Sequence, residues 1–508
     1  MTSGIAGSGR FRTVVILNGG IVMKKEKIVS SLLALIMALP VTNAIGAIAE
    51  SKIKGDVNSD NVFNLSDMVS FSRYLLGRGE LGNAECGDLN GDGELDIFDY
   101  VGMRELLLSD ISKWTQSMDN AGSLNLCQGV NASQKNGKEA DERFILGQTE
   151  FSLELLKNTA EADKNVLISP YSVMQALAMT ANGADGATKE EMEKVLGGLK
   201  IEELNEYLLA QRLSQPSIEG CKVNVANSIW TNKGEFSPAA EFIQTNVDYY
   251  NSDVFSAPFN NATLDDINKW IENKTDGMIP KILDKFGPNA VAELVNAVTF
   301  DSEWETLYEE NKIIDGTFTA SDGSEQDVKM LSSTESTYLT TDNAVGFMKP
   351  YKGGRYSFAA LLPDADITPE ELISDLDAEE FNSIFADKDN YAEVNVSIPK
   401  FTVEYGAELP DALKKMGIEN AFTEEADFSK MSADGLDDVY IGNVIHKTAL
   451  ELTEKGTRAA AATVVEMAEK GMPMNLKSVV LDRPFVYCII DNETSLPLFI
   501  GIQNSIDE

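Results

Sequence analysis

The sequence predicts a multidomain α+β protein in which a small all-α module precedes a large α+β domain. The chain has 508 residues, which is enough for two or more domains. Its hydrophobic content of 43% is that of a globular protein with a large core. An acidic loop followed by a short helical pattern occurs twice before residue 111, and this repeat defines the small module. The class of the larger domain rests on the motifs described below.

The charge and the histidine count exclude several functions. The chain has 81 acidic and 42 basic residues, and its net charge of -39 argues against nucleic acids and anionic membranes as partners, because both are also negative. His446 is the only histidine, so a Ser-His-Asp or Cys-His site would have to use it, and no GxSxG-like turn accompanies it. No glycosidase-like pair of carboxylates emerges among the acidic residues. The composition therefore argues against an enzyme.

The N-terminal region predicts export. A basic stretch that starts at Met23 is followed by an apolar run too short to span a membrane. Ala47 and Ala49 are small residues at the two positions that a signal peptidase reads. Residues 23–49 are therefore predicted to be a signal peptide of a secreted protein, and residues 1–22 an upstream mis-start.

The four cysteines are too few and too scattered for a disulfide scaffold. Cys488 lies in the apolar run VYCII and is predicted to be buried and inert. A disulfide between Cys86 and Cys127 would tie the small module to the segment that follows it, and this pairing stays open at the level of sequence.

The duplicated pattern has the ligand order of a calcium loop. Each copy places oxygen-bearing side chains at loop positions 1, 3, 5, 9 and 12 and a backbone carbonyl at position 7, as in an EF-hand. Gly93 supplies the sharp turn of the second loop and Asn61 that of the first, because Asn tolerates the left-handed region. The pattern predicts two Ca²⁺ sites. The predicted ligands are Asp56, Asn58, Asp60, Val62, Asn64 and Asp67 in the first loop and Asp88, Asn90, Asp92, Glu94, Asp96 and Asp99 in the second.

Each calcium loop is followed by a helix with an apolar pattern, over residues 68–76 and 100–108, and no incoming helix precedes either loop. Two such loop–helix units, with Asp rather than Glu at position 12, resemble a type I dockerin. Dockerins plug a protein into a cohesin module of the scaffold of a cellulosome. The resemblance covers residues 54–110 and implies a protein of a cellulosomal bacterium, anchored outside the cell by calcium-dependent cohesin binding.

Loop positions 10 and 11 help dockerins choose their cohesin. Here they hold Leu65-Ser66 in the first repeat and Ile97-Phe98 in the second, and this difference argues against two equivalent docking orientations. A calcium-stabilised extracellular module without a docking role is the alternative. Residues 111–140 are rich in Ser, Asn, Gln, Gly and Lys and are predicted to be a linker.

Residues 454–463, which read EKGTRAAAAT, are ambiguous between helix and strand. Thr457 as N-cap, the alanine run and Gly471 as C-cap favour a helix. In a strand, alternate residues would form two faces, and the face that includes Thr457 is uncharged, whereas Arg458 and Glu466 fall on the other. An uncharged face of small residues suits a segment that enters a sheet as a middle strand.

Motifs in the order and spacing of one family run through the rest of the chain. They are NVLISPYS at 165–172, GADGATKEEM at 183–192, NVANSIW at 224–230, INKW at 267–270, TDGMI at 275–279, LVNAVTFDSEW at 294–304, VIHK at 444–447, PFVY at 484–487 and PLFIG at 497–501. Together they resemble an inhibitory serpin over residues 141–508. The resemblance implies three β-sheets, about nine helices and a mobile reactive loop. The chain departs from the family in having Thr-Phe-Asp-Ser at 299–302 instead of Tyr-Phe-Lys-Gly, and Arg458 where Glu is common.

The resemblance assigns roles to three groups of residues. The hinge, where the reactive loop enters the sheet, comprises Glu454, Gly456, Thr457, Ala459, Ala460, Ala461, Ala462 and Thr463. The shutter beneath the sheet comprises Ser172, Asn296 and His446, with the histidine as a hydrogen-bond latch. The breach at the top of the sheet comprises Trp304, Lys400 and Glu454, and an ion pair between the last two would hold the hinge shut until cleavage.

The family mechanism is a protease trap rather than catalysis. A protease that attacks the loop forms an acyl-enzyme and cuts the tether, and the freed loop then inserts into the sheet. Insertion releases on the order of ten kcal/mol and distorts the protease before hydrolysis is complete. Counting from Glu454 places the reactive bond at Lys470–Gly471, which favours trypsin-like proteases, whereas Met467 or Met472 would suit subtilisin- or chymotrypsin-like ones.

The sequence favours a secreted inhibitor of serine proteases carried on a cellulosome, and two other functions are the alternatives. A non-inhibitory serpin acting as a binding protein is the first, and the uncharged hinge face argues against it. A carbohydrate-active enzyme, the usual cargo of dockerins, is the second, and the single histidine argues against that.

Overall fold

The chain divides into two compact units, Met1–Asp110 and Ile111–Glu508, and each is described by itself. The structure is a computed structural model. It describes residues 54–55, 57, 63, 65–75, 77–79, 81–89, 93, 95–97 and 99–104 of the first unit and residues 122–287, 291–390, 392–433, 435, 439–457 and 476–506 of the second. Within these ranges no helix is both long and apolar enough to cross a bilayer.

The N-terminal unit is built around helix α2 (Leu65–Leu75), which follows the first predicted calcium loop, and a short 3-10 helix, η1 (Ala84–Cys86). Residues 99–104, after the second loop, are also helical. The two loop–helix units share a small core of buried side chains, namely Val57, Met68, Phe71 and Met103.

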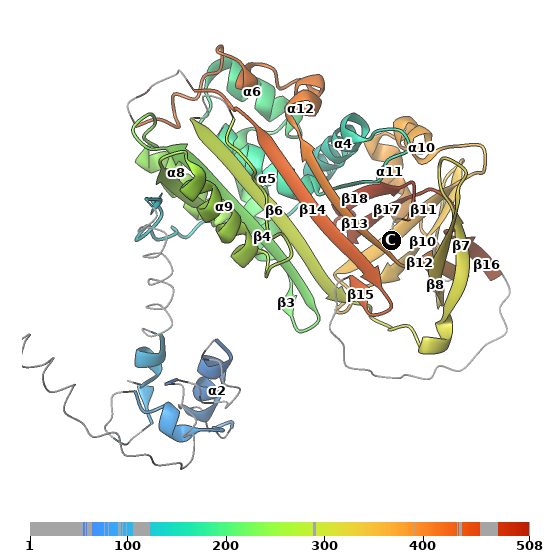
Figure 1. Ribbon diagram of the computed structural model, residues 1–508, viewed down its shortest axis with the longest axis horizontal. Helices are drawn as coiled ribbons and strands as arrows, with labels where there is room; N and C mark the ends of the chain where they lie inside the picture. The colour runs from blue at the N-terminus through green and yellow to red at the C-terminus, as the bar shows by residue number, and fades with distance from the viewer. Residues whose placement is uncertain are drawn as a thin grey trace, which may run out of the picture. The chain divides into compact units, whose positions relative to one another are not determined.

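The large sheet of the C-terminal unit has eight strands in the order β1-β5-β4-β6-β15-β14-β13, with β3 paired to β4. Figure 1 shows β6 and β14 side by side in it, with β15 at one end of both. The strands are β1 (Leu124–Asn125), β3 (Ser217–Ile218), β4 (Cys221–Asn232), β5 (Asp253–Ala257), β6 (Ala292–Glu303), β13 (Phe401–Glu408), β14 (Val444–Thr453) and β15 (Gly456–Thr457).

Two further sheets complete the strands of this unit. The six-stranded sheet runs β2-β18-β17-β11-β10-β9, and the four-stranded sheet runs β16-β12-β8-β7. Their bounds are β2 (Val166–Ile168), β7 (Ile313–Thr319), β8 (Glu325–Glu335), β9 (Thr337–Thr340), β10 (Ala344–Pro350), β11 (Tyr356–Pro363), β12 (Glu393–Pro399), β16 (Leu476–Val480), β17 (Phe485–Asp491) and β18 (Pro497–Gln503). The three sheets implied by the sequence are confirmed.

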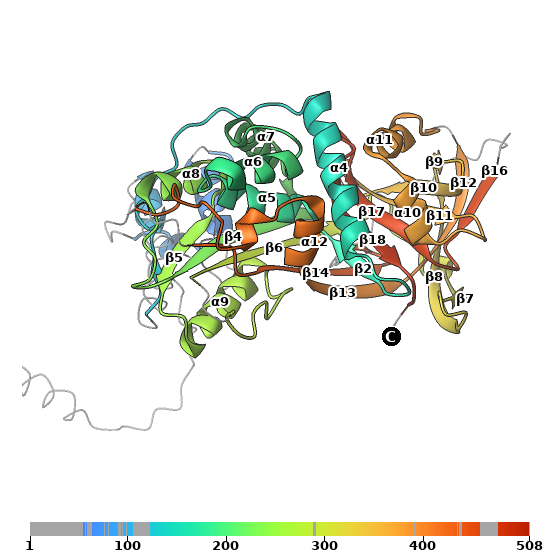
Figure 2. The same cartoon turned by 90° about the horizontal axis from the view of Figure 1, so that it is seen from above.

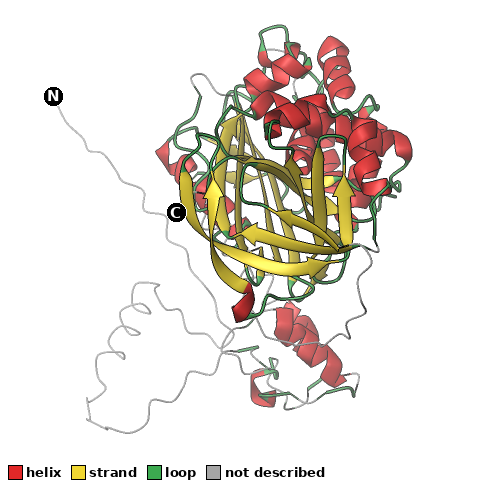
Figure 3. Ribbon diagram, turned by 90° about the vertical axis from the view of Figure 1, so that its right-hand side faces the viewer, coloured by secondary structure: helices red, strands yellow, loops and turns green. Residues whose placement is uncertain are grey.

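Five helices of the C-terminal unit, α4, α5, α9, α10 and α11, begin at residues whose side chains cap them. Asp141 accepts a hydrogen bond from Phe144 N at the start of α4, and Ser169 with Pro170 starts α5. Figure 3 shows many of the helices grouped at the upper right of the strands. They are α4 (Glu142–Thr159), α5 (Pro170–Ala181), α6 (Gly186–Val195), α7 (Ile201–Leu213), α8 (Ala240–Tyr250), α9 (Asn261–Lys274), α10 (Pro369–Asp375), α11 (Ala378–Ala386) and α12 (Pro410–Met416), with 3-10 turns η2 (Glu310–Lys312) and η3 (Asn420–Phe422).

The core of this unit lies on both faces of the large sheet. Alternate residues of β6 point to opposite faces, so Leu294 joins a core cluster with α5 and Val295 joins one with α9. Figures 1 and 2 show α9 on one face of the sheet and α5 on the other. At this end of the strand β6 is therefore buried on both faces.

The linker predicted at 111–140 is shorter in the structure, because residues from Gly122 onward lie on the C-terminal unit. Ser123 is 1% exposed, and β1 pairs with the edge strand β5. Polar composition favoured a linker, but these polar side chains have specific partners in the folded domain. Cys127 is a free thiol whose Sγ accepts a hydrogen bond from Val254 N, and burial raises its pKa to about 11. Cys86 belongs to the other unit, so the pairing left open by the sequence stays a prediction.

Candidate functional site

The shutter is a buried hydrogen-bond chain that crosses from α5 to the middle of the large sheet. Ser172 Oγ donates to Asn296 Oδ1, and Asn296 Nδ2 donates to Asn227 Oδ1 on β4. Asn227 Nδ2 in turn donates to Gln175 Oε1 over 2.7 Å. None of the four side chains is more than 5% exposed. Ser172 and Asn296, two of the predicted shutter residues, are thus joined directly. Asn227 and Gln175 are two further members of this hydrogen-bond chain.

His446 lies beside Asn296 across the seam between β14 and β6, since the two are paired in the parallel register. Its hydrogen bond is nevertheless with α5: Ser169 N donates to Nε2 over 3.0 Å. His446 is 1% exposed, and burial lowers its pKa to about 4. Within the described chain its Nδ1 has no hydrogen-bond partner. The histidine predicted as a latch is therefore hydrogen-bonded to Ser169 rather than to Ser172 or Asn296.

The strands β6 and β14 pair directly over one end of the seam only. There Leu294–Ala297 pair with Val444–Lys447 in parallel. At the far end β15 lies between them, pairing Thr457 with Ser302 on one side and with Leu452 on the other. Between these ends, residues 298–301 and 448–451, which the structure describes in full, are not paired with each other. The large sheet thus has a seam that is closed at both ends and unpaired in the middle.

The hinge enters this seam through Gly456 and Thr457. Gly456 has φ of +145°, and a Cβ at this position would collide with the carbonyl oxygen of Ser302, so only glycine fits. Thr457 is 1% exposed, and its Oγ1 shares a hydrogen bond of 2.6 Å with Tyr351 Oη. Thr457, the first residue of the predicted uncharged face, is therefore already buried. Its orientation determines which face of the sheet the alternate residues after it would join on insertion.

The breach holds the turn between β14 and β15. Trp304 Nε1 donates to Thr453 O over 2.9 Å, and Trp304 N donates to Lys455 O over 3.0 Å. Lys400 Nζ lies 2.8 Å from Glu454 Oε2, and this ammonium lowers the pKa of Glu454. The predicted ion pair is present, but both side chains are about a third exposed, so its direct contribution to stability is small.

A buried ion pair beneath the breach was not predicted from the sequence. Lys349 on β10 lies 2.8 Å from Glu335 on β8, and their side chains are 3% and 9% exposed. The ammonium also lies 5.5 Å from the ring centroid of Trp304 and 4.5 Å from that of Tyr308, whose backbone N–H donates to Glu454 O. This pair therefore supports the aromatic residues that hold the hinge. Nothing in the sequence around either residue predicts this pair, which only the fold brings together.

The remaining predicted site residues lie outside the described residues. In the hinge and reactive loop these are Ala459, Ala460, Ala461, Ala462, Thr463, Lys470 and Gly471, and in the calcium loops they are Asp56, Asn58, Asp60, Val62, Asn64, Asn90, Asp92 and Glu94.

The described calcium-loop residues take equivalent positions in the two repeats. Asp67 Oδ1 accepts a hydrogen bond from Val57 N over 3.0 Å, and Asp99 Oδ1 accepts one from Leu89 N over 2.8 Å. In each repeat the carboxylate at position 12 thus closes the loop onto position 2, and both are fully buried. Gly93, with φ of +85°, donates to Asp88 Oδ2 over 3.0 Å. Buried carboxylates at the closing position fit a loop that holds a divalent cation.

Comparisons with known proteins agree with this architecture. Residues 146–505 match the family described as Serpin (serine protease inhibitor), and residues 54–108 match the Dockerin type I domain. Intracellular coagulation inhibitor 2 of Tachypleus tridentatus is 28% identical over 393 residues, covering 75% of this chain and 95% of the relative. Serpin-Z7 of Hordeum vulgare is 31% identical over 383 residues, covering 70% and 95% respectively.

Solved structures agree as well. The native state of Tengpin, a thermophilic serpin, superposes with a TM-score of 0.72 at 43% sequence identity, covering 76% of this chain and all of the other. Its latent state superposes with a TM-score of 0.65 at 41% identity, covering 73% of this chain and again all of the other. The chain belongs to the serpin family of serine protease inhibitors, and it carries a type I dockerin domain ahead of the serpin domain.

Proposed function

We propose that the protein is a secreted suicide-substrate inhibitor of serine proteases that is held on a cellulosome scaffold by calcium-dependent binding of its dockerin to a cohesin. The observation that carries the inhibitory part is the seam between β6 and β14. It is unpaired in the middle, and the chain that would fill it already enters at one end through β15.

The register of the seam is the same at its two ends, which supports insertion without any sliding of the strands. Continued residue by residue, the antiparallel register of β15 would place Thr463 opposite both Asn296 and His446, and these two are already paired with each other. A strand of matching length can therefore enter by widening the seam alone. Each inserted residue adds backbone hydrogen bonds worth about 0.5–1.5 kcal/mol net, which supplies the driving force.

The same register accounts for the uncharged face of the hinge. Ala459 would lie between Phe300 and Leu450, which are 1% and 2% exposed. A charged side chain at this position would be buried without a partner, at a cost of several kcal/mol. In the inserted strand Ala460, one residue further, would point to the opposite face of the sheet.

Trapping is tested by mixing the protein with trypsin and with subtilisin and examining the products on a denaturing gel. The proposal expects a covalent complex with trypsin and a released peptide that begins at Gly471, because a lysine at position 470 suits trypsin-like proteases. A complex with subtilisin and cleavage after Met467 or Met472 would move the reactive bond but keep the mechanism. Cleavage with no complex for either protease would instead indicate a non-inhibitory serpin.

Two variants one residue apart separate trapping from simple recognition by the protease. Ala459→Glu places a carboxylate on the inserting face and should turn the inhibitor into a substrate that is cleaved without a complex. Ala460→Glu places it on the opposite face and should still give the complex. Equal behaviour of the two variants would contradict the register described above.

The dockerin part rests on the equivalent closing bonds of the two calcium loops. Asp67 and Asp99, as described residues, would each supply ligand oxygens, and Ca²⁺ would cross-link the loop to the helix that follows. A cohesin pull-down in Ca²⁺ and in EDTA tests this part, and Asp67→Ala together with Asp99→Ala should abolish retention. Retention in EDTA would contradict calcium-dependent docking.

A further inference from the structure

The end of the seam that lies farthest from β15 is called the foot below. It is where Ala292 begins β6 and Val444 begins β14. Residues 464–467 lie outside the described residues, but the antiparallel register of β15, continued to them, would place Met467 opposite Ala292 and Glu466 opposite Glu293. The foot would therefore receive the last residues of an inserted loop that can pair with β6.

The face of the foot that packs against α5 has a small apolar cavity of about 20 Å³. Its lining includes Ala292 and Leu294 of β6 and, from a distant segment, Met431. Directly opposed residues of neighbouring strands share a face, so Met467 would lie on the face of Ala292, above this cavity. A flexible apolar side chain is suited to fill an irregular apolar gap. The cavity thus supports the continued register independently.

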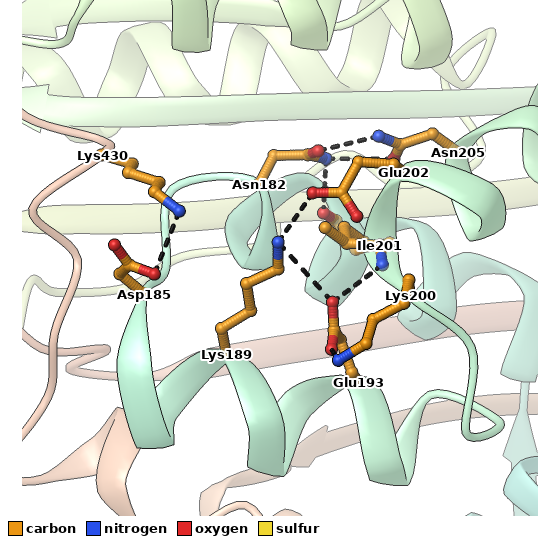
Figure 4. Close-up of polar contacts among 10 residues, drawn as sticks. Asn182, Asp185, Lys189, Glu193, Lys200, Ile201, Glu202, Asn205 and Lys430 are labelled. Carbon is orange, nitrogen blue, oxygen red and sulfur yellow. Dashed lines mark hydrogen bonds and ion pairs between the residues drawn. The ribbon is translucent and has the colours of Figure 1, made fainter.

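Polar contacts beside the cavity hold its wall in place. Figure 4 shows Lys430, the neighbour of Met431 in the chain, with its Nζ 3.0 Å from Asp185 Oδ1. At the end of α5, Asn205 Nδ2 donates to Asn182 Oδ1 over 2.8 Å. These contacts join the segment that contains Met431 to the turn after α5 and join α5 to α7. The lining is therefore already in place while the seam is closed.

The opposite face of the foot, which packs against α9 and the segment after it, holds a buried carboxyl group. Glu293 is 2% exposed, and Gly287 N donates to its Oε1 over 3.2 Å. Burial, with a smaller contribution from the carboxylate of Glu408 on β13, raises the pKa of Glu293 to about 7. Near neutral pH this carboxyl group is therefore present in both its protonated and its ionised form.

The charged groups near Glu293 come from β13, β14 and the segment after α9, around a groove of about 500 Å³ on this face. The charged residues that line the groove are Asp284, Lys285, Glu408 and Lys447. Lys447 Nζ donates to Lys281 O over 3.0 Å, and on β4 the residue opposite Glu293 is the uncharged Trp230. Two acidic and two basic groups thus line the groove, and Glu408 is the one that raises the pKa of Glu293.

We propose that Glu293 makes the last step of loop insertion depend on pH, because Glu466 docks beside it most favourably while Glu293 carries a proton. The proposal rests on the trapping function proposed above, since Glu466 reaches the foot only when the loop is almost completely inserted. Opposed side chains of neighbouring strands have Cβ atoms about 5 Å apart. A protonated Glu293 can donate a hydrogen bond to the carboxylate of Glu466, whereas two ionised carboxylates at this distance repel each other.

The direction of the pH effect follows from the two states of the foot. Before insertion the pKa of Glu293 is about 7, and the carboxylate of Glu466 raises it further once the loop has docked. The inserted form therefore binds the proton more tightly than the uninserted form. Insertion as far as the foot has its full driving force below about pH 7 and loses part of it as the pH rises above 7.

The test measures how much full-length inhibitor is consumed per trypsin inactivated, at pH 6 and at pH 9. Glu293→Gln keeps a side-chain oxygen that accepts the hydrogen bond from Gly287 N but does not titrate. Glu466→Gln removes the charge that would meet Glu293. Glu469→Gln, the same substitution three residues further along the loop, is the matched control, because the register would place it beyond the start of β6.

The expected result concerns the ratio of inhibitor consumed at pH 9 to that consumed at pH 6. This ratio should be at least about three times larger for the wild type and Glu469→Gln than for Glu293→Gln and Glu466→Gln. The pH dependence of trypsin itself is common to all four proteins and cancels in this comparison. A wild-type ratio in either Glu293→Gln or Glu466→Gln would overturn the proposal. A lowered ratio in Glu469→Gln would also overturn it, because the effect would then arise in recognition of the loop by trypsin.

Failure of the trapping function is observed separately, as the absence of a covalent complex with the wild type at either pH. Docking at the foot is then measured without a trap, by cutting each protein with trypsin and following the unfolding of the cut protein in urea at pH 6 and pH 9. A larger loss of urea stability at pH 9 in the wild type and Glu469→Gln than in the other two variants would support the pairing of Glu466 with Glu293. Equal losses in all four proteins would overturn it.

Discussion

Acid should open the seam between β6 and β14, because His446 is buried there in its neutral form. Burial lowers the pKa of His446 from 6.5 to about 4, and the residue is 1% exposed. Where β6 and β14 part, water reaches the imidazole and the pKa returns toward 6.5. The open state therefore binds the proton more readily. Stability of the closed seam is complete above about pH 6.5 and is lost progressively as the pH falls toward 4.

The size of the effect follows from the two pKa values. At pH 5 the imidazole is almost fully protonated in the open state and mostly neutral in the closed state. The ratio of open to closed molecules should then rise about 20-fold relative to pH 7, which corresponds to about 2 kcal/mol. Below pH 4 the full difference is about 3 kcal/mol.

Hydrogen exchange of the backbone amides along the seam measures this opening. Exchange rates of β6 and β14 amides at pH 5 and pH 7, corrected for the intrinsic pH dependence, give the change in the open population. His446→Gln is the control, because its side-chain oxygen can still accept the hydrogen bond from Ser169 N but does not titrate. The wild type should show the roughly 20-fold change and the variant only the smaller effect of the surrounding carboxylates. An equal pH response in both proteins would refute the reasoning.

Three further predictions concern the hinge, the inserted strand and the dockerin. Gly456→Ala should lower the free energy of unfolding by about 1–3 kcal/mol, measured by urea titration, because the added Cβ collides with Ser302 O; an unchanged transition would contradict this. In the inserted strand the register would place Arg458 opposite Asp301 and Glu451. Arg458→Glu should therefore raise the amount of inhibitor consumed per trypsin inactivated by about two- to fivefold, and adding Asp301→Lys should reverse part of that rise. A double variant that consumes as much inhibitor as the single one would argue against the pairing. Removal of Ca²⁺ with EDTA should abolish the thermal transition of the N-terminal unit and leave that of the serpin domain in place, because the core of the smaller unit has few buried side chains. Circular dichroism measures both transitions, and a shift of both would contradict independent unfolding of the two units.

The candidate site was predictable where it depends on local pattern. The position of the hinge follows from Gly456 and from the alternation that begins at Thr457, and the structure confirms that Thr457 is buried. The Lys400–Glu454 pair was also predicted and is present. Ser169 was missed as the partner of His446 because it donates through its backbone N–H, which any residue except proline would supply, so its side chain gives no signal in the sequence.

Other parts of the site could not be predicted because their members come from separate sheets. Lys349 and Glu335 are buried against each other from β10 and β8, and nothing in either local sequence distinguishes them from surface charges. The segment from Gly122 to residue 140 has the composition of a linker, and its attachment depends on acidic partners more than a hundred residues away along the chain.

By itself the sequence determined the calcium-loop spacing, the uncharged face of the hinge and the residue types at the shutter and the breach. The first two follow from the periods of strand and loop, which depend only on backbone geometry, whereas the shutter and breach residues came from the resemblance to the serpin family. Only the tertiary structure decided the register across the seam, which puts His446 beside Asn296 and leaves the middle of β6 and β14 unpaired. Register is set by which distant side chains pack together, and that is not encoded in any one segment.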